Sequence, residues 1–428
     1  MALILLLAAH LRLAASLDTV VDNPYRADAG DYMSYALNLR LHGVYSQVHP
    51  GAGEPVPDSI RSPGYPLMLL PFLDDEMSAR MLSHIYLFQA LLGVIVVGAV
   101  FLIGRTFLPV PWTLLASFLT AISPHLINAG VFVLSEPAFA VLVALLLLAW
   151  VHLPGRGMAW VMVCGFLLGL AMLVRPTANL MFPVLAMMLF AHMPRGQALR
   201  ASGVLLIALA LVYAPWPARN VVRFGNTGDN RLMINMLHHG MYPDFTYEGV
   251  PESRGFPYEA DPRAHEIGSS VHSTVTEIER RFAEEPGRHL RWFLLGKPVS
   301  LWSWDDAQGE TATFAYPVFR SPYFEREGFR MTYQVSHGLH WPIVILAAFF
   351  SVAVWLPGYL RNRKAEAAFA ARSCSLLLFY VTALHMIGAP FSRYAVPFRP
   401  ELFLAACAGA WLLVDIVRNR LHALREAS

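Results

Sequence analysis

The chain has 428 residues, of which 56% are hydrophobic and only 14% are charged. Soluble domains carry about a quarter charged residues, so this composition excludes an ordinary soluble enzyme and indicates an integral membrane protein. The net charge of +2 gives no reason to expect nucleic-acid binding, and the three cysteines, Cys164, Cys374 and Cys407, provide neither a disulfide framework nor zinc-ligand spacing.

Apolar runs of about 17–20 residues are long enough to cross a bilayer as helices. We therefore predict an all-α polytopic membrane protein with about ten transmembrane helices, a large first outer loop and a mixed outer segment at 218–338. The runs lie near residues 2–17, 84–104, 110–127, 134–152, 158–174, 178–193, 202–217, 339–357, 373–389 and 400–417. The predicted domains are 1–217 with outer loop 18–83, the extracytoplasmic segment 218–338, and the C-terminal helices 339–428.

The first apolar run has two interpretations. Residues 1–17 could be a signal peptide, since Ala14, Ala15 and Ser16 resemble a cleavage site for small residues. No Lys or Arg precedes the run, which favours a retained helix and leaves open a start further upstream.

Loop charges predict the orientation, because Lys and Arg concentrate in cytoplasmic connections. One alternating set of connections is rich in basic residues, so both termini are expected inside. These residues are Arg105, Arg156, Arg195, Arg200, Arg361, Arg363, Lys364, Arg372, Arg418, Arg420 and Arg425. The outer side then receives 18–83, the link near 128–135, the turn at Arg175, 218–338, and the turn 390–399.

Two carboxylates and an arginine stand out in the first outer loop. Asp28 and Asp31 follow the first apolar run, and Arg61 lies beside Pro63, Gly64 and Pro66 before the next one. Charged groups at a membrane are costly and mark functional sites. This pattern predicts a site at the membrane surface where a carboxylate accepts a proton from one substrate group and the arginine neutralises a phosphate on another substrate group.

Further charged residues fall at the outer membrane edge. Arg175, Arg219 and Arg393 each lie beside Pro or Tyr and could bind a phosphate or pair with a carboxylate. Glu136 precedes Pro137 at the start of an apolar helix, where a carboxylate also favours the helix dipole. In the outer segment, an amphipathic helix is predicted over 274–295, with a break at Pro286.

Short motifs in a fixed order run along most of the chain. They are Asp28 with Tyr32, Ala36, Leu39 and Gly43; Arg61 with Pro63, Gly64, Tyr65 and Pro66; Leu134 to Glu136; Gly169 to Arg175 and Pro176, with Pro183; Pro215, Trp216, Arg219 and Asn220; Glu285, Pro286 and Leu290; and Arg393, Tyr394 and Pro397. In this order they resemble the GT-C superfamily of membrane glycosyltransferases, within it the branch of aminoarabinose transferase and the protein O-mannosyltransferases (glycosyltransferase family 39 and its relatives).

The resemblance implies an inverting glycosyltransferase of the bacterial inner membrane. Such an enzyme moves a sugar from a polyprenyl-phosphate carrier to an envelope glycan, lipid or protein on the periplasmic or external side. It implies that Asp28 is the catalytic base, with Asp31 as the alternative. One of the two aspartates could instead have the purely structural role of capping a helix. It further implies substrate contacts from Tyr32, Arg61, Tyr65, Glu136, Arg175, Arg219, Arg393 and Tyr394. Arg61 could instead anchor to lipid headgroups.

Other assignments stay open at this point. No cofactor is certain; some relatives use a divalent metal, and His238, His239, His337 and His340 are outer candidates without a ligand spacing that singles one out. A transporter and a catalytically silent GT-C-like assembly protein are the alternatives. The charges gather at one face and repeats are absent from the sequence, which favours the transferase over a transporter. The sugar, the acceptor and the oligomeric state do not follow from the sequence.

Overall fold

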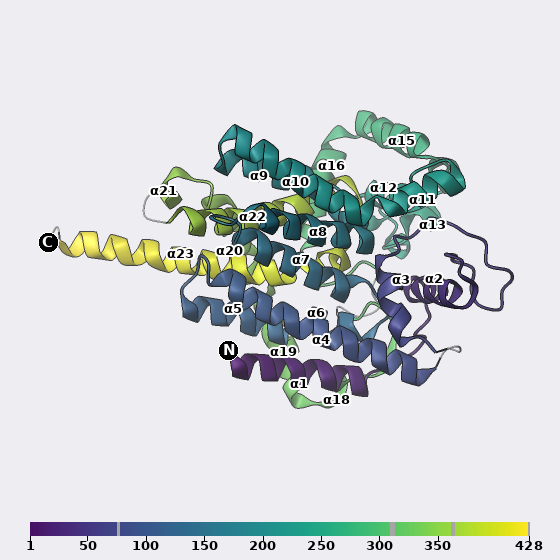
Figure 1. The fold of residues 1–428 in the computed structure, drawn as a ribbon, viewed down its shortest axis with the longest axis horizontal. Helices are drawn as coiled ribbons and strands as arrows, with labels where there is room; N and C mark the ends of the chain where they lie inside the picture. Colours follow the sequence, from purple (N-terminus) through teal and green to yellow (C-terminus); the bar gives the residue numbers. More distant parts are fainter. Residues whose placement is uncertain (75–77, 309–312, 361–363, 427–428) are drawn as a thin grey trace.

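The computed structural model describes residues 1–74, 78–308, 313–360 and 364–426 (Figure 1). Helices dominate this part of the chain. They are α1 (Ala2–Asp18), α2 (Asp28–His42), α3 (Gly64–Leu69), α4 (Ala79–Gly104), α5 (Val110–Ile122), α6 (Pro124–Asn128), α7 (Glu136–Val151), α8 (Met158–Val174), α9 (Met181–His192), α10 (Arg195–Tyr213), α11 (Pro215–Phe224), α12 (Arg231–Gly240), α13 (Pro257–Ala260), α14 (Ala264–Ile267), α15 (Val271–Glu284), α16 (Pro286–Arg291), α17 (Lys297–Leu301), α18 (Pro322–Glu325), α19 (Glu327–Gly338), α20 (His340–Ala353), α21 (Pro357–Leu360), α22 (Ala365–Ile387) and α23 (Arg399–Glu426).

The prediction of an all-α membrane protein agrees with these helices, but ten transmembrane spans are not confirmed. Four described helices are long and apolar enough to cross a membrane: Ala79–Gly104, Arg195–Tyr213, Ala365–Ile387 and Ser392–Leu421. The number reaches six if each of two bent pairs, Val110–Ile122 with Pro124–Val131 and Glu327–Gly338 with His340–Ala353, is one span. The other apolar helices are shorter. At 1.5 Å per residue, the 16 residues of α7 extend about 24 Å, less than the ~30 Å hydrocarbon core.

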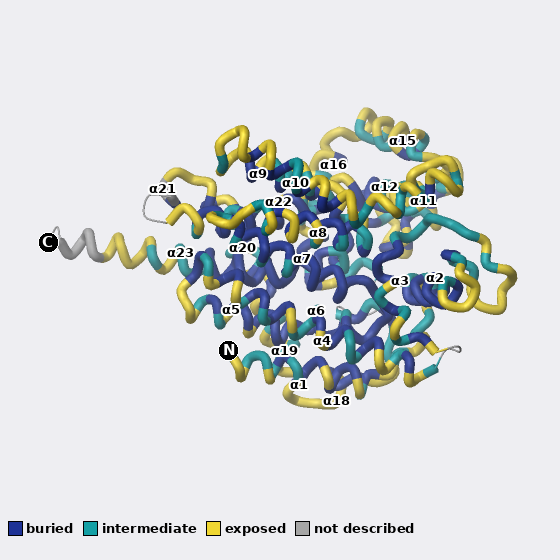
Figure 2. The backbone as a smooth tube through the Cα atoms, in the orientation of Figure 1, coloured by how far each residue is buried: buried dark blue, intermediate teal, exposed yellow. Residues whose placement is uncertain are grey.

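The core of the bundle surrounds α7. Nearly every residue of this helix is buried, and it packs against α4, α8 and α22 (Figure 2). A helix that is apolar on all sides belongs in the centre of a bundle. The helices outside it expose apolar side chains instead: on α10, Ile207 is 62% and Leu211 72% exposed. Such an exterior suits contact with lipid.

The two ends of the bundle differ. In Figure 1, α2, α3, α11, α12 and α13 gather at one end, and α21 and the C-terminus lie at the other. The first outer loop and much of segment 218–338 therefore meet at one end of the molecule.

A short antiparallel ribbon ties these two segments together. Strand β1 (Val20–Val21) pairs with β2 (Val318–Arg320), so that Val21 lies opposite Val318. Next to the ribbon, the backbone N–H of Asp22 donates to the carbonyl of Pro317 at 3.1 Å. The ribbon brings the residues just before β2 beside the start of α2.

The predicted amphipathic helix is confirmed together with its break. Ser270 caps α15 by accepting a hydrogen bond from the backbone N–H of Ser273 at 3.1 Å. The helix ends at Glu284, and α16 begins at Pro286. Proline favours the first turn of a helix because it has no N–H to leave unpaired, so it starts the new helix where the old one ends.

Candidate active site

Asp28 and Asp31 lie in the first turn of α2, where carboxylates face the positive end of the helix dipole. The residue before the helix, Ala27, has φ 47°, a left-handed conformation that non-glycine residues rarely adopt. At Gly30, an added Cβ would lie only 2.3 Å from the carbonyl oxygen of Tyr25. The chain therefore turns sharply and closely into this helix, and strain of this kind concentrates at functional sites.

Arg61 joins the two carboxylates. Its Nη2 donates to Asp28 Oδ1 at 2.6 Å and to Asp31 Oδ2 at 2.5 Å, and its Nε donates to the same Asp31 oxygen at 2.9 Å. The guanidinium also lies 5.0 Å from the ring centre of Tyr32. Its side chain is only 14% exposed, so Arg61 is a largely covered partner of the acidic pair rather than a free surface charge.

The glycine of the Arg61 motif holds this loop against the bundle. A Cβ on Gly64 would lie 2.6 Å from the backbone of Leu173, at the end of α8. Only glycine permits so close an approach of the two backbones. The contact sets the Arg61 loop beside the end of α8, immediately before Arg175.

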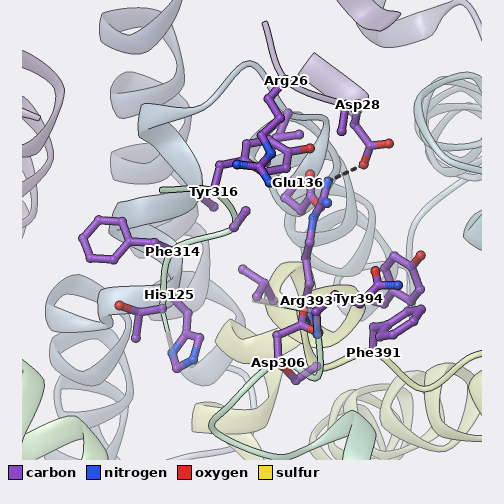
Figure 3. A pocket seen from close by; sticks show the side chains of 18 of the residues that line it. Arg26, Asp28, His125, Glu136, Asp306, Phe314, Tyr316, Phe391, Arg393 and Tyr394 are labelled. Atoms are coloured by element: carbon purple, nitrogen blue, oxygen red, sulfur yellow. Dashed lines mark hydrogen bonds and ion pairs between the residues drawn. The ribbon is translucent and has the colours of Figure 1, made fainter. Parts of the chain in front are cut away.

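Arg393 extends the network to the other side. It lies in the 3-10 helix η7 (Ser392–Phe398), and its Nη2 donates to Asp28 Oδ2 at 2.8 Å while its Nε donates to Glu136 Oε1 at 2.6 Å (Figure 3). Arg175 Nη1 lies 3.1 Å from the same Glu136 oxygen. Three arginines and three carboxylates thus alternate without a break, from Asp31 through Arg61, Asp28, Arg393 and Glu136 to Arg175.

The ion pairs determine the proton affinity of Asp28. Burial alone would raise its pKa, but the charges of Arg393 and Arg61 and their hydrogen bonds outweigh burial and hold the pKa below its ordinary value. Asp28 is therefore ionised and weakly basic while both arginines remain bound to it.

A cavity of about 300 Å³ opens beside this network. Of the predicted site residues, it is lined by Asp28, Glu136, Arg393 and Tyr394; Asp306 and Tyr316 also line it. In Figure 3, Asp28 and Asp306 lie toward opposite sides of the cavity, with Arg393 between them. One carboxylate oxygen of Asp306 accepts the backbone N–H of Arg393 at 3.1 Å, and the other accepts that of Gln308 at 3.2 Å. Burial raises the pKa of Asp306, opposite to the shift at Asp28.

The predicted tyrosines support the network. Tyr32 Oη lies 3.1 Å from Ser135 Oγ, next to Glu136, and its ring meets Tyr65 edge to face. Tyr65 Oη donates to Gln89 Oε1 at 2.7 Å. The ring of Tyr394 lies 5.6 Å from the guanidinium of Arg175. These contacts orient the charged side chains; only Tyr394 of the three lines the cavity.

Arg219 lies apart from this cluster. Its Nη1 donates to the carbonyl of Asp58 at 2.7 Å and to Asn220 Oδ1 at 2.8 Å, and its guanidinium packs 5.1 Å from the ring of Trp216. It also contacts Tyr45, whose ring lies 5.8 Å from the guanidinium and whose hydroxyl donates to the Arg61 carbonyl. Its contact with substrate stays a prediction.

Asp306 is a cavity carboxylate that sequence reasoning missed; Arg26, Asn235 and Gln308 also line the cavity without having been predicted. Asp306 lies in an irregular stretch between α17 and β2, where no apolar periodicity or motif marks it. The neighbouring acidic pair of Asp305 and Asp306 was the available signal. Tyr316 is one of several outer aromatic residues whose sequence positions suit either stacking on a sugar or anchoring at the membrane interface, and His239 is one of several outer histidines, so the sequence singled out neither.

The described residues hold no group of three or more His, Cys, Asp or Glu suited to a metal ion. Of the outer histidines, His238 Nε2 lies 3.1 Å from Tyr242 Oη, and His340 Nε2 bonds to the carbonyl of Trp302. Asp28 and Glu136, two carboxylates that line the cavity, are both paired with Arg393. This arrangement does not fit a metal, so we derive no step through one.

Comparison with known proteins gives a family match and a shared fold. Residues 78–217 match the sequence profile of a protein family described as dolichyl-phosphate-mannose-protein mannosyltransferase. No curated protein matches the chain. Among solved structures, the oligosaccharyltransferase AglB of Archaeoglobus fulgidus, in complex with an inhibitory peptide and a dolichol-phosphate, aligns over 100% of this chain and 52% of its own, with a TM-score of 0.52 and 14% identity. The Archaeoglobus fulgidus oligosaccharyltransferase in complex with Zn and sulfate aligns over 99% of this chain and 51% of its own, with a TM-score of 0.52 and 14% identity.

ArnT of Cupriavidus metallidurans bound to undecaprenyl phosphate aligns at a TM-score of 0.45 and 13% identity, over 96% of this chain and 77% of its own. The chain spans about half the length of the AglB chains it matches. Together the family match and the AglB fold confirm what the motifs led us to expect: the chain has the fold of the GT-C superfamily of membrane glycosyltransferases.

Proposed function

We propose that the protein is an inverting glycosyltransferase that moves a sugar from a polyprenyl-phosphate carrier to an acceptor hydroxyl at the outer face of a bacterial inner membrane. The observation that carries this proposal is the pairing of Asp28, which lines the cavity, with two arginines: Arg393, which lines it too, and Arg61, which reaches it only through Asp28. The carboxylate of Asp28 can accept a proton, and the guanidinium groups of Arg61 and Arg393 can bind a phosphate.

Sugar transfer from a phosphate carrier needs both a proton acceptor and a group that binds the phosphate. The acceptor oxygen forms a bond to the sugar C1 as the bond from C1 to the phosphate oxygen breaks and its electron pair passes to the phosphate. The hydroxyl proton goes to a carboxylate acting as general base. Arginines stabilise the charge that develops on the leaving phosphate. A single displacement with a single base inverts the configuration at C1.

The alternatives for the base are Asp28 and Asp31. Asp28 lines the cavity and is therefore our choice, whereas Asp31 has one oxygen fully engaged by two nitrogens of Arg61 and is not among the residues lining the cavity. We assign Asp31 to orienting Arg61.

The charge balance suggests how the base becomes active. The three arginines of the network are matched by three carboxylates, so an arriving phosphate must compete with Asp28 for Arg61 and Arg393. When these arginines turn toward the phosphate, Asp28 loses the contacts that depress its pKa, and it becomes more basic. Donor binding would then prepare the base, and without donor the base stays weak.

Two further observations support this assignment over a transporter. The charged network and cavity involve α2, η7 and the ends of α7 and α8, at the end of the bundle where the outer segments gather, not a broken helix at mid-bundle. In addition, AglB, whose fold this chain shares, was solved with a dolichol-phosphate, itself a polyprenyl phosphate. Segment 218–338 forms the rest of that end, and we assign acceptor selection to it.

The test uses purified protein in detergent micelles, where no sealed compartment exists and transport cannot occur. A transferase consumes a polyprenyl-phosphate sugar and releases polyprenyl phosphate under these conditions, in the presence of envelope extract as acceptor. A protein that leaves the donor intact in micelles, but moves it across the membrane of proteoliposomes, would be a transporter. One that binds the donor in both settings without consuming or moving it would be a silent assembly protein.

A further inference from the structure

Three residues that line the cavity have a buried polar atom without a hydrogen-bond partner among the described residues: Glu136, whose Oε2 belongs to the charged network, and two neutral side chains, Tyr316 and His239. Tyr316 is 8% exposed, and among the described residues its hydroxyl makes no hydrogen bond of ordinary geometry; the polar group that acts on it is the Arg393 guanidinium, which lies 5.8 Å from the ring centre. His239 is 6% exposed, and its Nε2 also lacks a partner in this part of the chain. Both residues line the cavity. Buried polar atoms without partners are uncommon and costly, so two in one cavity point to a ligand that satisfies them.

Both side chains are also held in place by residues outside the charged network. Tyr316 lies just before β2, and its ring meets Phe132 edge to face at 5.5 Å. His239 lies at the end of α12, where Gly240 is so close to Gly388 that an added Cβ would lie 2.3 Å from the Gly388 carbonyl oxygen. The ring of His239 stacks on Tyr258 at 4.4 Å. Such fixed positions suit recognition, since little order is lost when a ligand binds.

The chemistry of the two groups defines their ligand. Burial lowers the pKa of His239 to about 4, so its ring is neutral at pH 7 and offers one donor and one acceptor. The tyrosine hydroxyl likewise donates and accepts. Neutral groups of this kind match alcohol hydroxyls better than phosphate or carboxylate, which arginines bind more strongly.

The remaining walls fit the same ligand. Phe256, Phe314 and Phe391 supply apolar faces, and the cavity of about 300 Å³ is at the small end of the range for ligand pockets. In Figure 3, Tyr316 and Phe391 lie on opposite sides of Arg393. An apolar face together with hydroxyl-binding groups in a small space is complementary to one ring that carries several hydroxyls.

We propose that Tyr316 and His239 are specificity residues that bind the hydroxyls of a single neutral sugar ring. This inference rests on the proposed function. It adds the residues that recognise the sugar and the expectation that the cavity holds a single sugar ring. The sugar could belong to the lipid-linked donor or to the acceptor, and the experiment separates these sources.

The test compares the full chain in detergent with the variants Tyr316→Phe and His239→Phe, which keep the rings and remove the polar atoms. Tyr323→Phe is the matched control, because Tyr323 is 6% exposed and its hydroxyl also lacks a described partner, but it does not line the cavity. Equal thermal unfolding midpoints establish that all variants fold. Affinities are measured by native mass spectrometry for undecaprenyl phosphate and for undecaprenyl phosphates carrying glucose, mannose or galactose.

If the ring belongs to the donor, at least one sugar-bearing lipid binds more tightly than undecaprenyl phosphate. Tyr316→Phe and His239→Phe should each reduce that gain by about two- to tenfold, the value of a neutral hydrogen bond. Binding of the bare carrier should not change, and Tyr323→Phe should behave as wild type. If the ring belongs to the acceptor, the same losses appear instead for methyl glycosides of these hexoses, added to protein saturated with undecaprenyl phosphate.

A sugar-dependent gain that survives in both variants would overturn the proposal, as would the absence of any gain in either arm. Arg61→Ala separates this result from the proposed function. If Arg61→Ala binds undecaprenyl phosphate as tightly as wild type does, the assignment of Arg61 to the phosphate fails, whatever the sugar measurements give.

Discussion

Arg393 Nη2 lies 2.8 Å from Asp28 Oδ2, although 365 residues separate the two along the chain. The pair joins the first outer loop to the turn before the last helix. Neither the N-terminal helices nor the C-terminal helices complete the site alone. Because Arg393 also bonds to Glu136, its position decides both how Asp28 is charged and how the start of α7 is held.

Asp28→Asn should abolish most of the activity. The change keeps the shape of the side chain and removes its basicity, and loss of a general base costs roughly a hundredfold or more in rate. The measurement is kcat for sugar transfer, with Asp31→Asn as the comparison. We expect the Asp31 variant to retain more activity than the Asp28 variant. Near-normal turnover by Asp28→Asn beside an inactive Asp31→Asn would assign the base to Asp31.

Arg61→Ala should weaken donor binding and lower kcat, while the acceptor KM changes little. A charge-assisted contact is worth about 1.5–3 kcal/mol, and part of it develops only as the phosphate gains charge in the transition state. Arg61→Lys should recover some activity, since it keeps the charge without the two-pronged geometry. A variant in which only the acceptor KM rises would place Arg61 on the acceptor side and leave the phosphate to Arg393 or Arg175.

Glu136→Ala should destabilise the protein by about 3–5 kcal/mol, because it leaves Arg393 and Arg175 buried without their shared partner. Only 2% of the Glu136 side chain is exposed. Thermal and denaturant unfolding in detergent would measure the loss. The control is Glu285→Ala, which removes an exposed carboxylate paired with Arg288 on the surface and should leave the unfolding midpoint unchanged. Equal effects of the two substitutions would contradict the buried network.

Stability should fall in mild acid partly because of His239. Burial lowers its pKa from 6.5 to about 4, so folding favours the neutral ring. The contribution is complete above pH 6.5 and is lost as the pH falls toward 4, by about 3 kcal/mol in total. Unfolding free energies measured from pH 7.5 to 4 should therefore decline less steeply for His239→Phe than for wild type. Parallel curves would show that His239 is solvated in the folded protein.

The orientation can be tested with one introduced cysteine. Glu252 is exposed in segment 218–338, and the native cysteines are all buried, so background labelling should be low. Glu252→Cys should react with a membrane-impermeant thiol reagent added to intact cells or spheroplasts. Labelling only after lysis would place this segment in the cytoplasm and would contradict the proposal that the lipid carrier binds at the outer face.

Local patterns predicted much of the fold, because long apolar runs become helices wherever they are buried or meet lipid. Each predicted run contains a helix, and the break at Pro286 lies where proline chemistry requires it. The number of membrane crossings did not follow, since composition alone does not fix helix length: α7 is apolar throughout, yet its 16 residues are short for a span.

The candidate site was predictable where it depends on motifs. Asp28, Arg61, Glu136 and Arg393 lie together in the structure, and their order along the chain had suggested a common site. Asp306, Tyr316 and His239 reach the cavity through long-range contacts instead: the β1–β2 ribbon, the backbone bond from Arg393 to Asp306, and the approach of Gly240 to Gly388. A single sequence carries no local signal for such pairings.

The most direct test of the mechanism is the fate of the sugar C1 in a single turnover. Purified wild-type protein and Asp28→Asn would be given a polyprenyl phosphate carrying a ¹³C-labelled sugar with envelope extract as acceptor, and NMR would follow the configuration of the labelled carbon. The account predicts one product with inverted configuration, together with free polyprenyl phosphate, and at most about a hundredth of that rate with Asp28→Asn. Retention of configuration, or equal product formation by the two proteins, would contradict a single displacement with Asp28 as its base.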